Sequence, residues 1–221
     1  ITVSADELLD CGAILPPTVN VHTVDTVRTR EEVADIDAET VLRVIEADDA
    51  ERVLVSAPSA RIINAMMAFT DLFRDLRQAD YNVMTITSKH GAIINGKKVS
   101  RTQFFETLDN FSATGQKFVL FHYSILSEGI NVSGLTNVVL FRNLSTVEMA
   151  QTIGRVIRLD TQDRNNISNG TLRPRAYHNY NKPTGFISIP VYNNYGKATA
   201  KRVQRTVDTI FKHGKPATAW I

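Results

Sequence analysis

The sequence lacks most of the residues and runs that mark a secreted, metal-bound or membrane-spanning protein. Cys11 is the only cysteine in 221 residues, which excludes a disulfide framework and a cysteine-based zinc site. No run of 18 or more apolar residues occurs, and residues 1–4 lack the basic and apolar segments of a secretory signal. The five histidines have no spacing suited to metal ligation. We therefore expect a cytoplasmic protein without membrane contact, and no metal held by this chain alone.

What remains is the composition of an ordinary globular protein. Apolar residues make up 43% of the chain and charged residues 22%, which excludes disordered, collagen-like and coiled-coil classes. A length of 221 residues corresponds to one domain, or to one domain with an appendage. The sequence begins at Ile1 without an initiator methionine, so we expect a part of a longer protein.

Charge is distributed unevenly behind a formal net charge of +2. The net charge is −9 over residues 1–52, +3 over residues 53–160 and +8 over residues 161–221. An asymmetry of this kind indicates an interaction surface rather than a fold.

Hydrophobic patterning predicts an α/β fold. The runs 53–56, 118–121 and 138–141 are continuously apolar or nearly so, which is typical of parallel strands covered on both faces. Amphipathic stretches between them predict helices. The sequence therefore predicts an open, mostly parallel sheet with helices on both faces. Further strands are expected at 18–24, 81–87 and 186–191, and helices after an N-cap at Asp37, over 58–76, over 100–111 and over 199–213.

A capping box marks the start of one helix. Ser145 and Glu148 have the spacing in which each side chain bonds the other's backbone, so a helix should begin at Thr146. We expect one edge of this helix to pack on the sheet through Val147, Ala150, Gly154 and Ile157.

The same helix carries a glutamine and two arginines. At about 100° per residue, Gln151, Arg155 and Arg158 fall within an arc of about 60°. Two guanidiniums side by side suit a polyphosphate, because their planar forks pair with phosphate oxygens and stay charged. The alternative for these arginines is a set of surface salt bridges.

Read together, several segments resemble motifs IV to VI of superfamily-two helicases. Residues 151–158 match the motif VI pattern Gln-x-x-Gly-Arg-x-x-Arg in full, and residues 118–131 resemble motif V and the strand before it. Residues 53–56 resemble the strand of motif IV. The resemblance covers residues 52–160, with four further matches at His90, Gly91, Arg101 and Phe111.

The resemblance implies a RecA-like domain in which some residues contact ATP and others contact nucleic acid. Gln151, Arg155 and Arg158 would face ATP held between two RecA-like domains, with the two arginines as finger candidates. The same nucleotide cleft would be lined by Glu128, Gly129 and Asn131, although many family members have aspartate where Asn131 stands. The nucleic-acid backbone would lie near Ser56, Pro58, Ser59, His90, Gly91, Tyr123 and Ser124.

The resemblance also implies partners and a missing half. The sequence has neither a complete Walker A loop nor the Asp-Glu segment that binds Mg²⁺, so an N-terminal RecA-like domain of the same protein would hold most of the metal. We expect residues 1–50 to be an acidic segment connecting to that domain. Residues 51–221 would form the C-terminal RecA-like domain, with a polar insertion at about 161–185 and a basic C-terminal helix. The expected function is an ATP-dependent helicase motor acting on nucleic acid, on DNA in preference to RNA, and inactive as this chain alone.

Three alternatives stay open. Residues 91–98 are one position short of a Walker A loop, which would make Lys97 the phosphate ligand of a free-standing P-loop enzyme, but Lys98 stands where a metal-binding Ser or Thr belongs. A second alternative is a restriction-enzyme-type translocase of double-stranded DNA. The third is a non-catalytic nucleic-acid-binding module built on the basic tail, whose candidates are Arg173, Arg175, Tyr177, Tyr180, Lys182, Lys197, Lys201, Arg202 and Arg205.

Overall fold

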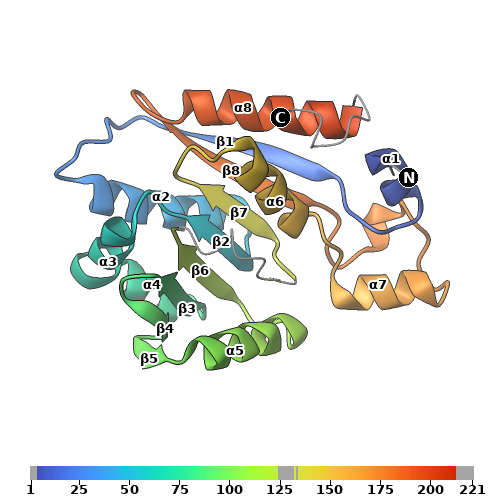
Figure 1. The fold of residues 1–221 in the computed structure, drawn as a ribbon, viewed down its shortest axis with the longest axis horizontal. Coiled ribbons are helices and arrows are strands. Elements are labelled where there is room, and N and C mark those ends of the chain that lie inside the picture. Colours follow the sequence, from blue (N-terminus) through green and yellow to red (C-terminus); the bar gives the residue numbers. More distant parts are fainter. Residues whose placement is uncertain (1–3, 124–131, 133, 213–221) are drawn as a thin grey trace.

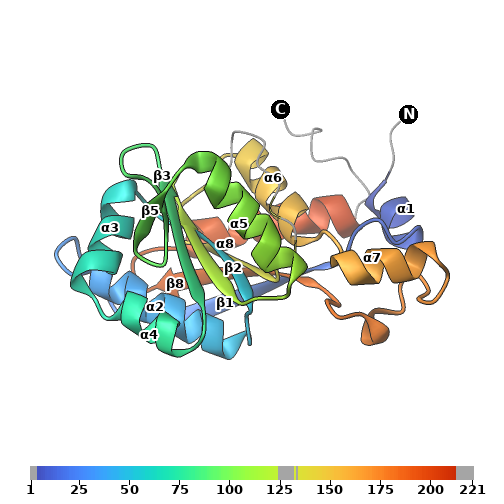
Figure 2. The same ribbon diagram turned by 90° about the horizontal axis from the view of Figure 1, so that it is seen from below.

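The computed structural model describes residues 4–123, 132 and 134–212, and its centre is one mixed sheet (Figures 1 and 2). Its eight strands lie in the order β1-β8-β7-β2-β6-β3-β4-β5. All neighbours from β1 to β3 pair in parallel, and β4 and β5 add antiparallel pairs. The strands are β1 Pro17–Val24, β2 Arg52–Ser56, β3 Asn82–Thr87, β4 Gly91–Ile94, β5 Lys97–Val99, β6 Phe118–His122, β7 Asn137–Leu140 and β8 Gly185–Tyr192.

Helices cover both faces of the sheet, which confirms the predicted fold class (Figure 1). They are α1 Ala5–Asp10, α2 Val33–Ala47, α3 Ala60–Phe69, α4 Leu72–Gln78, α5 Arg101–Ala113, α6 Thr146–Val156, α7 Thr161–Ser168 and α8 Lys197–Val207, with short turns of helix at Tyr177–Asn179 and Asp208–Lys212.

Two cores lie on opposite sides of the sheet because successive strand residues point to opposite faces. Leu54 packs into the core under α5, α6 and α8. Its neighbours Val53 and Val55 pack into the core under α2, α3 and α4. Both cores are fully enclosed, which is why the central strands read as continuous apolar runs.

The first fifty residues contribute to the sheet itself. β1 pairs along its whole length with β8, and α2 packs on the same sheet face as α3 and α4. The segment expected to connect two domains is therefore, from residue 17 onward, an edge strand and a covering helix.

Asp37 is not the N-cap of a helix, as the sequence predicted. α2 begins four residues earlier, and Asp37 lies on its buried face with 0% of the residue exposed. Arg28 donates two hydrogen bonds to the carboxylate, from Nε at 2.7 Å and from Nη2 at 2.5 Å. The hydroxyl of Tyr192 donates a third, at 3.2 Å. The carboxylate is thus buried with its partners rather than exposed at a helix end.

The acidic and basic ends of the sequence meet at one end of the molecule, where α1 and α7 lie side by side (Figures 1 and 2). Arg175, within the predicted polar insertion, pairs with Asp6 and Asp10 of α1, both at 2.6 Å. A small separate core of Leu15, Leu159 and Tyr180 lies under this region. Part of the basic tail is therefore neutralised by the acidic segment.

The Walker-like segment is a β-hairpin. β4 and β5 pair in antiparallel across the dipeptide Asn95-Gly96, whose φ angles are 49° and 80°. Asn-Gly with both angles positive is the favoured two-residue hairpin turn. A P-loop needs a strand, a glycine-rich loop and a helix, so this geometry excludes Lys97 as a Walker lysine.

Candidate functional site

Three parallel strands end together at one edge of the sheet. Ser56 at the end of β2 aligns with His122 of β6 on one side and with Leu140 of β7 on the other. Ligand-binding residues of open α/β sheets collect at the carboxyl ends of the strands. This edge is therefore where the predicted nucleic-acid residues come together.

Arg142 connects these strand ends, and the sequence analysis missed it. Its Nε donates to the Ser56 hydroxyl at 3.2 Å, and its Nη2 pairs with Glu148 at 3.0 Å. Its guanidinium lies 5.3 Å from the centroid of the Tyr123 ring. The available signal was position, since Arg142 follows directly after a buried apolar run that ends at this edge.

The predicted nucleic-acid residues differ in accessibility. Ser56 is only 1% exposed and its hydroxyl is occupied by Arg142, so its side chain does not reach the surface. Pro58 and Ser59 are half-buried, and Ser59 caps α3 by accepting from the Ile62 amide at 3.2 Å. Tyr123 is 39% exposed. The accessible residues among those predicted to contact nucleic acid therefore include Tyr123, Pro58 and Ser59.

His90 and Gly91 lie at the end of the neighbouring strand β3. The Nε2 of His90 is 2.8 Å from the side-chain Nδ2 of Asn64 on α3. This contact connects the turn to the helix that Ser59 caps. Gly91 begins β4 with a φ of 75°, a conformation that glycine adopts without strain. Asn64 thus connects the turn at His90 and Gly91 with α3, the helix that follows Pro58 and Ser59.

A basic groove opens beside Ser59. It has a volume of about 510 Å³ and is lined by Arg28, Arg30 and Arg61, with Glu31 as its acidic member. Arg28 also pairs with Asp37, whereas Arg30 and Arg61 are exposed. We call this hollow the arginine groove. It was not predicted, because Arg30 and Arg61 are distant in the sequence.

The helix α6 begins where its capping box predicts. The Glu148 amide donates to the Ser145 hydroxyl at 3.3 Å, and the Glu148 carboxylate accepts from the Ser145 amide at 3.0 Å. Of the residues predicted to pack on the sheet, Ile157 is buried in the core at 7% exposure, whereas Val147 is 56% exposed. The buried residues of α6 are Met149, Thr152, Ile153, Arg155 and Val156. Gln151 lies on the exposed side.

The two arginines are not on one helical face. α6 ends at Val156 and Ile157 is its C-cap, so Arg158 lies beyond the helix, where its backbone bridges to Ile14. Arg155 is only 6% exposed, and its pKa is lowered by burial and by the positive charge of Arg158. The predicted arc is therefore wrong for Arg158, although the two guanidinium charges still act on each other.

A buried histidine lies within electrostatic range of Arg142 and Arg155. His122 is 2% exposed, and burial together with the charges of Arg142 and Arg155 lowers its pKa to about 3. Neither ring nitrogen has a hydrogen-bond partner among the described residues. His122 is therefore neutral at physiological pH and adds no positive charge to those of Arg142 and Arg155.

Four predicted residues, Ser124, Glu128, Gly129 and Asn131, lie outside the described residues. Within the described part of the chain, no three His, Cys, Asp or Glu side chains gather closely enough to hold a metal ion. No helix among these residues combines the length and the apolar character needed to cross a membrane.

Solved structures with similar folds include two restriction enzymes. The ATP-dependent Type ISP restriction-modification enzyme LlaBIII bound to DNA is 13% identical, with a TM-score of 0.58 over 95% of this chain and 15% of its own. A fragment assigned as the HsdR subunit of a type I restriction enzyme from Vibrio vulnificus YJ016 is 19% identical, with a TM-score of 0.52 over 84% of this chain and 38% of its own. This chain thus spans only a small part of both.

The C-terminal domain of the DEAD-box protein Dbp5 is 14% identical, with a TM-score of 0.47 over 87% of this chain and 84% of its own. No curated protein sequence matches the chain. Residues 37–160 match the family described as the helicase conserved C-terminal domain, which is more than half of the 221 residues. The chain therefore belongs to this family, and its fold is that of the C-terminal RecA-like domain of superfamily-two helicases.

Proposed function

We propose that this chain is the second motor domain of an ATP-dependent nucleic-acid helicase or translocase. The observation that carries the proposal is the pair Arg155 and Arg158 at the end of α6, inside the segment that matches the helicase family. The pair would bind the phosphate oxygens of ATP at the face shared with an N-terminal RecA-like domain. That domain would hold Mg²⁺, and Gln151 would contact the nucleotide from the exposed side of α6.

The electrostatics of the pair support an anionic ligand. The charge of Arg158 and the burial of Arg155 both disfavour the guanidinium cation at position 155, as the lowered pKa shows. A polyphosphate placed against both groups would relieve this repulsion and form charge-assisted hydrogen bonds. Bound ATP supplies the phosphoryl group for hydrolysis, and an arginine placed on its developing charge can contribute ~10³–10⁵ in rate.

The carboxyl edge of the sheet would form part of the nucleic-acid track. Tyr123, with Arg142 over its ring, offers a stacking surface, and the arginine groove offers cations for phosphates. We propose DNA as the nucleic acid, and LlaBIII, which shares the fold, is described as bound to DNA. This fold similarity also makes a restriction-enzyme-type translocase the form of motor to examine first.

The test compares ATP hydrolysis by the full-length protein with that of this chain alone. The full-length protein should hydrolyse ATP in a nucleic-acid-dependent manner, and residues 1–221 alone should show no turnover. Robust hydrolysis by this chain alone would contradict the proposal, because the chain would then complete an ATPase site without an N-terminal RecA-like domain. Tight DNA binding by a full-length protein without any ATPase activity would favour the non-catalytic binding module instead.

The arginine groove leads to a prediction about salt dependence. Replacing Arg30 and Arg61 together by alanine in the full-length protein should weaken duplex-DNA binding and lower the slope of log K against log salt by about 2, since each lost phosphate contact removes about 0.9. The measurement is fluorescence anisotropy at several salt concentrations. Arg43→Ala, an exposed arginine on α2 outside the groove, is the matched control and should leave the slope unchanged. An unchanged slope in the double variant would remove the groove from the track.

A further inference from the structure

A buried lysine holds the end of α6. Lys182 is 2% exposed, and its Nζ donates to the carbonyl oxygens of Val156 and Arg158, both at 2.6 Å. The carbonyl between them, that of Ile157, accepts from the Leu15 amide at 2.7 Å. Three successive carbonyls of the turn that carries Arg158 are therefore fixed from two directions.

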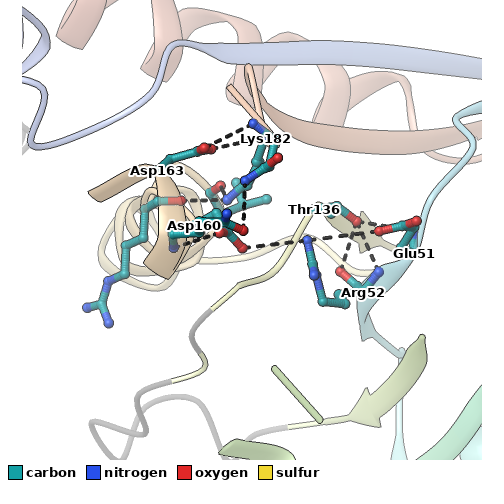
Figure 3. A network of polar contacts seen from close by, with 10 residues as sticks. Glu51, Arg52, Thr136, Asp160, Asp163 and Lys182 are labelled. Atoms are coloured by element: carbon teal, nitrogen blue, oxygen red, sulfur yellow. Dashed lines mark hydrogen bonds and ion pairs between the residues drawn. The ribbon is translucent and has the colours of Figure 1, made fainter. Parts of the chain in front are cut away.

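The backbone of Lys182 is in turn held by Asp163 of α7. The Asp163 carboxylate accepts from the backbone amides of Asn181 and Lys182, each at 3.0 Å, and Asp163 is 1% exposed (Figure 3). Gly185, three residues after the lysine, lies so close to α6 that a Cβ there would be 2.4 Å from the Val156 carbonyl oxygen. The start of β8 is thus packed directly against the turn that follows α6.

The effects of burial and of the neighbouring charges on the pKa of Lys182 oppose one another in part, and the effects that lower it are larger. The charged groups that face Lys182 are Arg52 of β2, Asp160 and Asp163. Burial and Arg52 lower the lysine pKa to about 7, against the opposing effect of the two aspartates. The negative end of the α6 dipole favours the ammonium form at this point. Lys182 therefore loses its proton near neutral pH rather than near its ordinary value.

We propose that Lys182 is a positioning residue for ATP hydrolysis, because its bonds to the Val156 and Arg158 carbonyls set where Arg158 stands relative to Arg155. The inference rests on the proposed function, since it concerns the same two arginines. Arg158 lies beyond the last helical residue; its amide donates to the Arg155 carbonyl at 3.4 Å, and Lys182 binds its carbonyl. A misplacement of about 1 Å in such a group can cost about 10²-fold in rate.

The first test is Lys182→Met in the full-length protein, which keeps most of the stem and removes the donors. The kcat of nucleic-acid-stimulated ATP hydrolysis should fall by ~10- to 100-fold, with the KM for ATP little changed because the effect is on the transition state. Lys97→Met removes an equal charge from the exposed hairpin and should retain the kcat of the unmodified protein. A kcat for Lys182→Met equal to that of the Lys97→Met control would overturn the proposal.

The second test needs no variant that could misfold. Charge-assisted hydrogen bonds are about twice as strong as neutral ones, so kcat of the unmodified protein should decline as pH rises through the lysine pKa of about 7. Stability must change in the opposite direction. The folded pKa is below the unfolded value, so the folded state binds fewer protons over this range and the free energy of unfolding rises with pH. A purely structural lysine would not make the two quantities diverge.

Lys182→Arg separates the remaining possibilities, since guanidinium keeps its charge at any working pH. It should recover most of the kcat and lack the alkaline decline. A decline that persists in Lys182→Arg, or a kcat independent of pH in the unmodified protein, would overturn the proposal. Arg158→Ala in the same assay tells the two hypotheses apart: if that variant keeps full turnover, the proposed function fails, and if only the lysine variants keep it, this inference alone fails.

Discussion

Arg158→Ala in the full-length protein is expected to lower nucleic-acid-stimulated ATP hydrolysis by ~10³-fold or more, the range measured for arginine fingers. The reason is electrostatic, since charge develops on the phosphoryl oxygens and the two guanidiniums at the end of α6 would stabilise it. Binding of ATP in the ground state should be largely retained. Steady-state turnover and nucleotide binding are measured on the same preparation.

Arg158 is a sharper target than Arg155 because the two differ in burial. Arg155 is 6% exposed, so its truncation would also leave an unfilled space in the protein. Arg158 is half-buried and lies beyond the helix, so its removal should leave the fold intact. Arg164→Ala, an exposed arginine six residues later, provides the control and should retain normal turnover. Turnover of Arg158→Ala that matches the Arg164→Ala control would exclude the finger role.

Asp37→Ala is expected to destabilise the domain by ~3–5 kcal/mol, the cost of removing one partner of a buried ion pair. Arg28, whose side chain is 10% exposed, would be left without the carboxylate that accepts two of its hydrogen bonds. The hydroxyl of Tyr192 would lose the same acceptor. Urea denaturation of this chain should show a lower midpoint at an unchanged m-value.

The matched control for this experiment is Asp35→Ala on the same helix. Asp35 is exposed in the first turn of α2, where its charge is worth at most ~1 kcal/mol through the helix dipole. A loss of similar size in both variants would mean that the Arg28–Asp37 pair contributes nothing beyond a surface charge. Because Arg28 also lines the arginine groove, Asp37→Ala further tests whether that groove depends on the pair.

Local patterns predicted the strands and helices well because their causes are local. The apolar run at 118–121 became the central strand β6, and the capping box at Ser145 starts α6 one residue later. The order of the strands could not be predicted, because no local pattern around β1 indicates that it pairs with β8. The N-cap expected at Asp37 failed for the same reason, since Arg28 and Tyr192 determine its environment.

The sequence located candidate residues for the site but did not give their geometry. The pattern from Gln151 to Arg158 identified two arginines, yet a regular helix was assumed through Arg158 although it ends at Val156. Ser56 was placed correctly at a strand end, but the arginine that buries its hydroxyl comes from 86 residues later. Positions that depend on contacts between distant segments require the tertiary structure.

The pairing of β1 with β8 has a consequence for how the domain is made. Each residue of β1 pairs with one 168 positions later, and β8 also provides the outer neighbour of β7. During synthesis, the edges of β1 and β7 that pair with β8 therefore stay unpaired until β8 has been made. Contacts of such long sequence separation form slowly, and unpaired edges promote aggregation. The sheet can be completed only after Gly185–Tyr192 has been synthesised, so the domain cannot finish folding before its last strand is available.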